Sequence, residues 1–114
     1  MTNQQEESQN KEEGYEVDKK VISGLIKKAL KEVEGVYAVK RGLWGERIKI
    51  EYLQEGIGLS LELIIKEGNA IPQLVEETQK KVKQEVQRVL DKPVAKVNIK
   101  IKGIKYTSQT RRSK

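Results

Sequence analysis

The chain has 114 residues and a mass of 13.0 kDa, with 36% hydrophobic and 35% charged residues, which predicts one domain with a thin, two-layer core. It contains no cysteine and no histidine, which excludes a disulfide framework, a thiolate metal site and the commonest general base. No apolar run approaches the roughly 20 residues of a membrane-spanning helix, and the N-terminal stretch is acidic and polar, so we expect a soluble, cytoplasmic protein.

The net charge of +6 is divided unevenly along the chain. Residues 1–16 carry five glutamates and one lysine, a net charge of −4, whereas residues 96–114 carry seven lysines and arginines and no acid, a net charge of +7. The positive charge is therefore concentrated at the C-terminal end, which directs the search for a binding surface to that part of the chain.

Residues 1–13 have almost nothing to bury, which predicts a disordered acidic tail. Asp18 is placed to cap a first helix over residues 19–33, and Gly35 suits the left-handed position that follows a helix. The apolar stripe of this helix consists of Val21, Ile22, Leu25, Ile26, Ala29, Leu30 and Val33. A basic amphipathic helix can also lie on a membrane surface, but the predicted sheet needs both helices of the chain as cover.

Strands are predicted next, because apolar residues alternate with polar ones. Residues 36–41 form the first strand, residues 42–45 a turn, and residues 47–52 a strand whose inward residues are Ile48, Ile50 and Tyr52. After a turn at residues 54–56, the inward residues are Leu59, Leu61, Leu63 and Ile65, with Ile64 as an apolar exception on the outer side.

The longest predicted helix runs from Ala70 to Leu90, with Asn69 able to cap its free amides and Pro72 in its first turn. Its apolar side consists of Ile71, Leu74, Val75, Thr78, Val82, Val86, Val89 and Leu90. Asp91-Lys92-Pro93 ends the pattern, and the last strand points Val97, Ile99 and Ile101 inward. The segment from Ile57 to Lys102 therefore predicts a strand–helix–strand crossover with parallel strands.

Together these elements predict an α/β (α+β) fold, a two-layer sandwich in which two amphipathic helices cover one face of a mixed sheet of about four strands. Residues 14–105 form the single domain, and residues 106–114 form a basic C-terminal tail. The other face of the sheet is left open and polar.

No catalytic motif is present in the sequence. It lacks a phosphate-binding loop, a dinucleotide fingerprint and a nucleophile–base pair, and neither Ser23 nor Ser60 has a histidine to activate it. We therefore predict a non-enzymatic binding protein with no catalytic, cofactor-binding or metal-binding residues.

Two features suggest an interaction surface. Gly42-Leu43-Trp44-Gly45 resembles the G-x-x-G loop that clamps nucleic acid in KH domains, but that loop joins helices, so a hairpin turn with an exposed or half-buried Trp44 is preferred here. The flanking glycines favour the exposed position. Outward cations on the open sheet face form either a solvated face or a patch for an acidic protein or anionic lipid, with phosphate contact as a further alternative. The predicted interaction surface comprises Trp44, Arg47, Lys49, Lys96, Asn98, Lys100 and Lys102.

Four segments resemble the alkaline shock protein family, the envelope stress response proteins of Gram-positive bacteria. They are Gly14-Tyr15-Glu16-Val17 with Val21-Ile22, then Glu32 to Val36, then Gly68-Asn69-Ala70-Ile71-Pro72, and Val94 to Ile104. The chain departs from the family at Glu67, where an aromatic is common, and at Asp91-Lys92-Pro93, where a glycine is usual.

This resemblance implies a non-enzymatic, cytoplasmic protein that forms homo-oligomers and acts near the membrane through an anchoring protein partner. No cofactor follows from it. The alternative function is a small RNA-binding module that uses the turn at residues 42–45 and the lysine-rich last strand.

Overall fold

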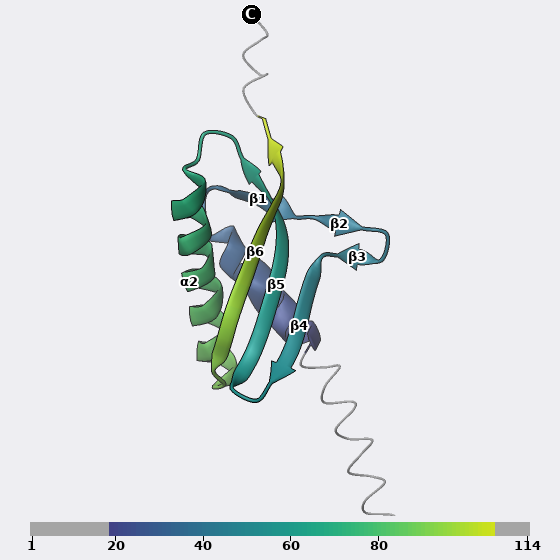
Figure 1. The fold of residues 1–114 in the computed structure, drawn as a ribbon, viewed down its shortest axis with the longest axis vertical. Helices are drawn as coiled ribbons and strands as arrows, with labels where there is room; N and C mark the ends of the chain where they lie inside the picture. Colours follow the sequence, from purple (N-terminus) through teal and green to yellow (C-terminus); the bar gives the residue numbers. More distant parts are fainter. Residues whose placement is uncertain (1–18, 107–114) are drawn as a thin grey trace, which may run out of the picture.

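The computed structural model describes residues 19–106, which form two helices and a mixed sheet (Figure 1). Residues 19–31 are helical. The later elements are β1 (Val36–Val39), β2 (Arg41–Gly42), β3 (Gly45–Glu46), β4 (Ile48–Leu53), β5 (Gly56–Lys66), α2 (Ile71–Leu90) and β6 (Val94–Lys105). The predicted acidic tail, the Asp18 cap and all of the basic tail beyond Tyr106 lie outside the described residues.

β5 is the central strand, and the other strands of the main sheet all pair with it. β6 runs parallel along one edge, from the pair Ile57–Val94 to the pair Lys66–Lys105. α2 connects these two strands, which confirms the predicted strand–helix–strand unit. The observed topology agrees with the predicted mixed sheet of an α+β fold.

Two strands share the opposite edge of β5. β4 runs antiparallel to its first half and β1 runs antiparallel to its last residues, so β1 and β4 are two parts of one interrupted edge. The interruption is closed by backbone hydrogen bonds from Lys40 N to Glu62 O (2.8 Å) and from Arg47 N to Lys40 O (2.8 Å). The residues between Lys40 and Arg47 leave the sheet as the β2–β3 hairpin, which projects to one side (Figure 1).

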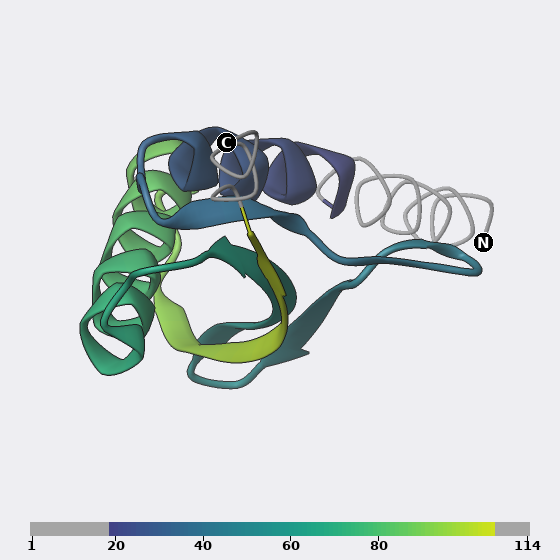
Figure 2. The ribbon, with the colours of Figure 1, turned by 90° about the horizontal axis from the view of Figure 1, so that it is seen from above.

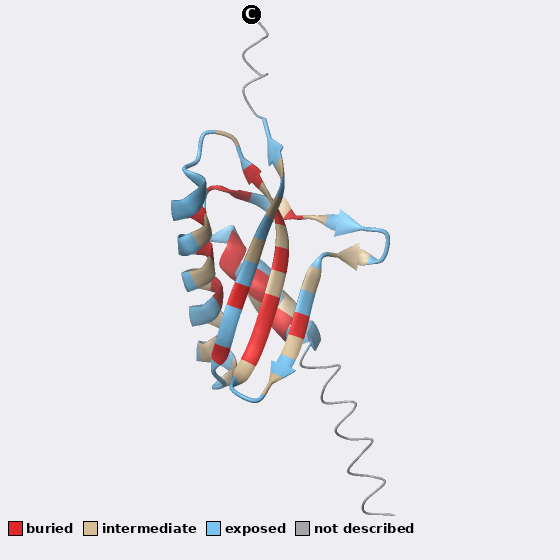
Figure 3. Cartoon of the chain, viewed as in Figure 1, coloured by how far each residue is buried: buried red, intermediate tan, exposed pale blue. Residues whose placement is uncertain are grey.

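Both helices lie on the same side of the sheet, as predicted (Figure 2). The inward residues of β5 are at most 3% exposed, and they pack against the inward stripes of both helices in one core (Figure 3). The most deeply buried side chains are Ile22, Ile26, Val33, Leu59, Leu61, Leu63, Ile65, Thr78, Val82 and Val86. Because each buried aliphatic side chain contributes about 1.5–3 kcal/mol, this single layer of contacts is the main source of stability.

Hydrogen bonds from α2 also protect the free edge of β6. The Gln79 side chain donates to Val97 O (3.0 Å), and the Gln87 side chain accepts from Val94 N (2.9 Å). Unpaired backbone groups on an edge strand invite pairing with other chains, so these two glutamines shield the first part of β6.

Two local predictions are wrong. Asn69 does not cap α2: the N-cap is Ala70, which has no side chain to do so, and the Asn69 amide donates instead to Lys66 O (3.0 Å), which closes the turn after β5. Gly35 does not have a positive φ angle. It is needed for space, because a Cβ atom there would lie 2.7 Å from Asn69 Oδ1 and 2.8 Å from Leu74 Cδ1.

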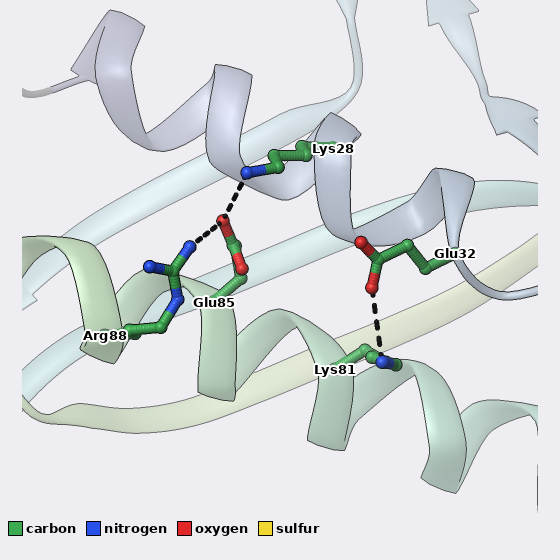
Figure 4. A network of polar contacts seen from close by, with 5 residues as sticks. All are labelled: Lys28, Glu32, Lys81, Glu85 and Arg88. Carbon is green, nitrogen blue, oxygen red and sulfur yellow. Dashed lines mark hydrogen bonds and ion pairs between the residues drawn. The ribbon is translucent and has the colours of Figure 1, made fainter.

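Ion pairs connect the outer sides of the two helices (Figure 4). Glu85 contacts Arg88 at 2.8 Å and Lys28 at 3.4 Å, and Lys81 contacts Glu32 at 3.2 Å. Burial by itself raises the pKa of Glu85, but the hydrogen bonds and positive charges of Arg88 and Lys28 outweigh burial and hold this pKa below its ordinary value.

The packing around Gly35 predicts that Gly35→Ala lowers the free energy of unfolding by about 1–3 kcal/mol, because the new methyl group overlaps Leu74. Urea denaturation measures this change. Gly24→Ala is the matched control: nothing lies within 4 Å of its Cβ position, and alanine in a helix is more stable than glycine by about 0.5–1 kcal/mol. Equal effects of the two substitutions would contradict the steric role of Gly35.

The lowered pKa of Glu85 predicts a pH-dependent contribution to stability. A carboxylate with a lowered pKa stabilises the folded state above its ordinary pKa of 4.5, and the contribution is lost as the pH falls below that value. Glu85→Gln should therefore lower the Tm at pH 7, and the difference from the unmodified protein should shrink in acid. Glu34→Gln, an exposed acid outside this network, serves as the control. A Tm difference that does not change with pH would exclude the ionic explanation.

Candidate interaction surface

The face of the sheet opposite the helices displays polar side chains in three rows. Strand pairing places Lys49, Ser60 and Asn98 in the middle row. The first row contains Arg47, Glu62 and Lys100, since Glu62 pairs with Lys100 and its N–H donates to Arg47 O. The third row contains Glu51, Gly58 and Lys96. The structure therefore brings together Arg47, Lys49, Lys96, Asn98 and Lys100, five of the residues singled out from sequence.

The middle and first rows form a shallow depression. Its walls include Arg47, Lys49, Ser60, Asn98 and Lys100, and it has a volume of 520 Å³. In the third row, Gly58 has no side chain, which lets its neighbours approach: its Cβ position is 3.4 Å from Lys96 Cε and 3.6 Å from Glu51 Oε1. The open face is thus hollowed and lined by hydrogen-bonding groups.

The charge of this face is mixed rather than uniformly basic. Arg47 Nε lies 3.3 Å from Glu62 Oε1, and Lys49 Nζ lies 3.5 Å from Glu51 Oε2. Glu51 and Glu62 are not part of the interaction surface predicted from sequence, which took only cations and Asn98 from these strands. Their place on this face can be read from the sequence: Glu51 follows Lys49 by two residues and Glu62 follows Ser60 by two, and residues two apart on a strand share a face.

Lys102 does not continue the row of outward residues on β6. The pairing shifts between Leu63–Ile101 and Ile64–Gly103, so Lys102 has no Cα partner on β5. The extra residue of such a bulge changes the direction of the side chains that follow it. Lys102 is exposed, but it is not among the residues that line the depression.

Trp44 lies apart from this face, at the end of the β2–β3 hairpin. Its exposed fraction is 93%, so the expectation of an exposed tryptophan is confirmed. The neighbouring Leu43 is 92% exposed and was not singled out from sequence. Its position between Trp44 and Gly42 in a predicted turn was the signal that could have found it.

Aromatic side chains are missing from the three rows. Tyr52, on β4, pairs with Ile57 and therefore has inward phase, as predicted, although it lies at the end of the core and is 39% exposed. Nucleic-acid-binding sheets place aromatic rings on the open face so that bases stack on them. The rows described here offer hydrogen bonds and charges only.

Within residues 19–106, no group of three or more acidic, histidine or cysteine side chains is arranged to hold a metal ion. In the same part of the chain, neither helix is both long and apolar enough to cross a bilayer. The fold and the surface define a class of protein: a small two-layer α+β domain whose sheet has one face covered by helices and one polar face left open.

The chain belongs to the alkaline shock protein 23 family, described as having a cell envelope-related function, whose sequence model matches residues 7–106. This confirms the resemblance drawn from the four sequence segments. Among curated proteins, none matches this chain.

Solved structures of the MamM CTD share the fold. One singly substituted variant aligns with a TM-score of 0.50 and 17% identity over 74% of this chain and 93% of that one. A doubly substituted variant aligns with a TM-score of 0.51 and 17% identity over 74% and 90%. A variant described as a zinc form aligns with a TM-score of 0.50 and 15% identity over 74% and 84%. At these identities the similarity concerns the fold alone.

The exposure of Trp44 predicts that the emission maximum of the dilute protein equals that of tryptophan in water, because this is the only tryptophan in the chain. Acrylamide should quench it almost as efficiently as free tryptophan. A blue-shifted maximum that is independent of protein concentration would show that the hairpin tip packs against the domain instead.

Proposed function

We propose that this protein is a non-enzymatic interaction protein of the cell envelope that self-associates and acts near the cytoplasmic membrane through partner proteins. The family match supports the envelope-related role. The observation that carries the proposal is the open face of the sheet, where a depression and three polar rows are left without cover by the two helices.

The mixed charge of this face favours a second copy of the chain as one of its partners. In a twofold dimer the same surface meets itself, so it must carry groups that attract each other. Cations and acids alternate here across short distances, with Glu62 between Arg47 and Lys100, and Glu51 opposite Lys96. A rotated copy can place the two glutamates of one protomer against lysines of the other.

RNA binding, the alternative, has weaker support. Glu51 and Glu62 lie among the cations and repel phosphates, and the three rows contain no aromatic ring for base stacking. An RNA-binding surface would produce an affinity that falls steeply with salt. Titration with single-stranded RNA at low salt tests this alternative, and the absence of binding there excludes it.

The proposal predicts that Lys96→Glu combined with Lys100→Glu raises the dissociation constant of the oligomer at least tenfold, since like charges then face each other across the interface. Light scattering over a range of protein concentrations at physiological salt measures the constant. Lys83→Glu with Lys92→Glu changes the net charge equally at exposed positions outside the sheet face and should have little effect. A strictly monomeric unmodified protein at high concentration would refute self-association.

A further inference from the structure

The β2–β3 hairpin presents two adjacent apolar side chains at the end of a projection from the sheet. Leu43 and Trp44 are 92% and 93% exposed, more than the other large apolar residues of the described chain. Single exposed apolar residues are common on protein surfaces. The β2–β3 hairpin projects from the sheet (Figure 1). A leucine and a tryptophan side by side in its turn place their apolar area where a bilayer or another molecule can reach it.

The backbone holds this tip in one arrangement. Arg41 pairs with Glu46 and Gly42 pairs with Gly45, so the turn contains only Leu43 and Trp44. Neither of them has a positive φ angle, and the positive φ that lets the chain reverse so tightly is provided by Gly45, with φ of 117°. The hairpin therefore has this conformation in the free protein, which lowers the conformational entropy lost on binding.

Positive charge surrounds the base of the hairpin. Lys40, Arg41 and Arg47 flank the tip. Two acids lie beside them: Glu46, which is matched by Lys27 at 2.9 Å and by Arg41 at 4.0 Å, and Glu62, which lies 3.3 Å from Arg47. The Arg41 side chain is 73% exposed. Arg47 lies back along the hairpin, with its Cδ atom 3.0 Å from the Cβ position of Gly42. The partner of this hairpin must therefore be apolar at the tip and negative around it.

A second copy of this chain does not meet that requirement. The cavity beside the hairpin, with a volume of 570 Å³, has an apolar floor that includes Leu30 and Val39. Its rim carries Lys27, Lys31, Arg41 and Lys66, with Glu46 as the only acid. A basic hairpin entering this basic cavity of another copy would bring like charges together.

The size of the tip also argues against a protein partner. Two such side chains bury on the order of 400 Å², about half of the roughly 800 Å² that each partner contributes to a stable interface. Insertion into a membrane interface does not require a contact area of about 800 Å². Tryptophan concentrates at the headgroup level of bilayers, and arginine and lysine beside it contact lipid phosphates.

We propose that the β2–β3 hairpin inserts Leu43 and Trp44 into the surface of a bilayer that contains anionic phospholipids, with Lys40, Arg41 and Arg47 contacting the headgroup phosphates. Each strand residue advances about 3.4 Å, so the tip reaches roughly 7 Å beyond Arg41. This matches the 5–10 Å depth at which apolar side chains of peripheral proteins reach the acyl boundary. Arg47 belongs to both surfaces, because it also lines the depression of the open sheet face and pairs with Glu62. Leu43, Trp44 and Arg41 lie outside that depression, so insertion of the tip does not depend on self-association through the open face.

Vesicle binding of the full chain tests the proposal. With vesicles of phosphatidylcholine and phosphatidylglycerol, we expect co-sedimentation, a blue shift of Trp44 emission and quenching of Trp44 by brominated acyl chains. Vesicles of phosphatidylcholine alone, or high salt, should reduce the partition coefficient at least tenfold, because the cations contribute little there.

The matched variants separate the tip from general apolar exposure. Leu43→Ser with Trp44→Ser should reduce partitioning at least tenfold without changing the fold, since both side chains are almost fully exposed. Ile71→Ser with Val89→Ser removes two exposed apolar side chains of α2, which are 41% and 45% exposed, and should leave partitioning unchanged.

Three outcomes would overturn the proposal. The first is an unmodified protein that does not sediment with anionic vesicles, and the second is a tip variant that binds them as well as the unmodified protein does. The third is a blue shift of Trp44 that appears on concentrating the protein without vesicles, which would assign the tip to a second copy. Loss of vesicle binding with intact self-association, or the reverse, distinguishes this inference from the proposed function.

Discussion

The structure depends on the one-sided burial of β5. Leu59, Leu61, Leu63 and Ile65 point from this strand into the helical layer and are almost fully buried, whereas Ser60 and Glu62 point the other way. The two helices of the described residues lie together on the face into which these side chains point, and they leave the other face without cover (Figure 2). The polar open face and its depression follow from this constraint, as does the placement of both helices on the same side.

A second consequence concerns the edges of β5. One edge is paired along its length with β6, while the other is divided between β4 and β1. The residues that leave the divided edge form the β2–β3 hairpin, which adds nothing to the core and pairs only with itself, through Arg41–Glu46 and Gly42–Gly45. Since it contributes no buried side chain, it can carry an exposed leucine and tryptophan without affecting the packing of the domain.

The domain thus separates two surfaces of different chemistry. The open face is hollowed and mixed in charge, which suits contact with a protein, including another copy of the chain. The hairpin is apolar at its tip and basic around it, which suits an anionic bilayer. The family has a cell envelope-related function, and under the two proposals the chain would contact proteins through one surface and a bilayer through the other.

The sequence by itself determined most of the elements and most of their inward residues, because the period of two in β5 and the three- and four-residue steps in both helices are local properties of the chain. Val21, Ile71 and Val89 are exceptions: they belong to the predicted apolar stripes but are 39%, 41% and 45% exposed. It also placed Trp44 in an exposed turn. Only the tertiary structure decided that β1 and β4 share one edge, that Glu51 and Glu62 neutralise part of the basic face, that a bulge displaces Lys102, and that Gly35 is required by Leu74. Each of these depends on strand pairing or contact between residues far apart in the chain, which no local pattern encodes.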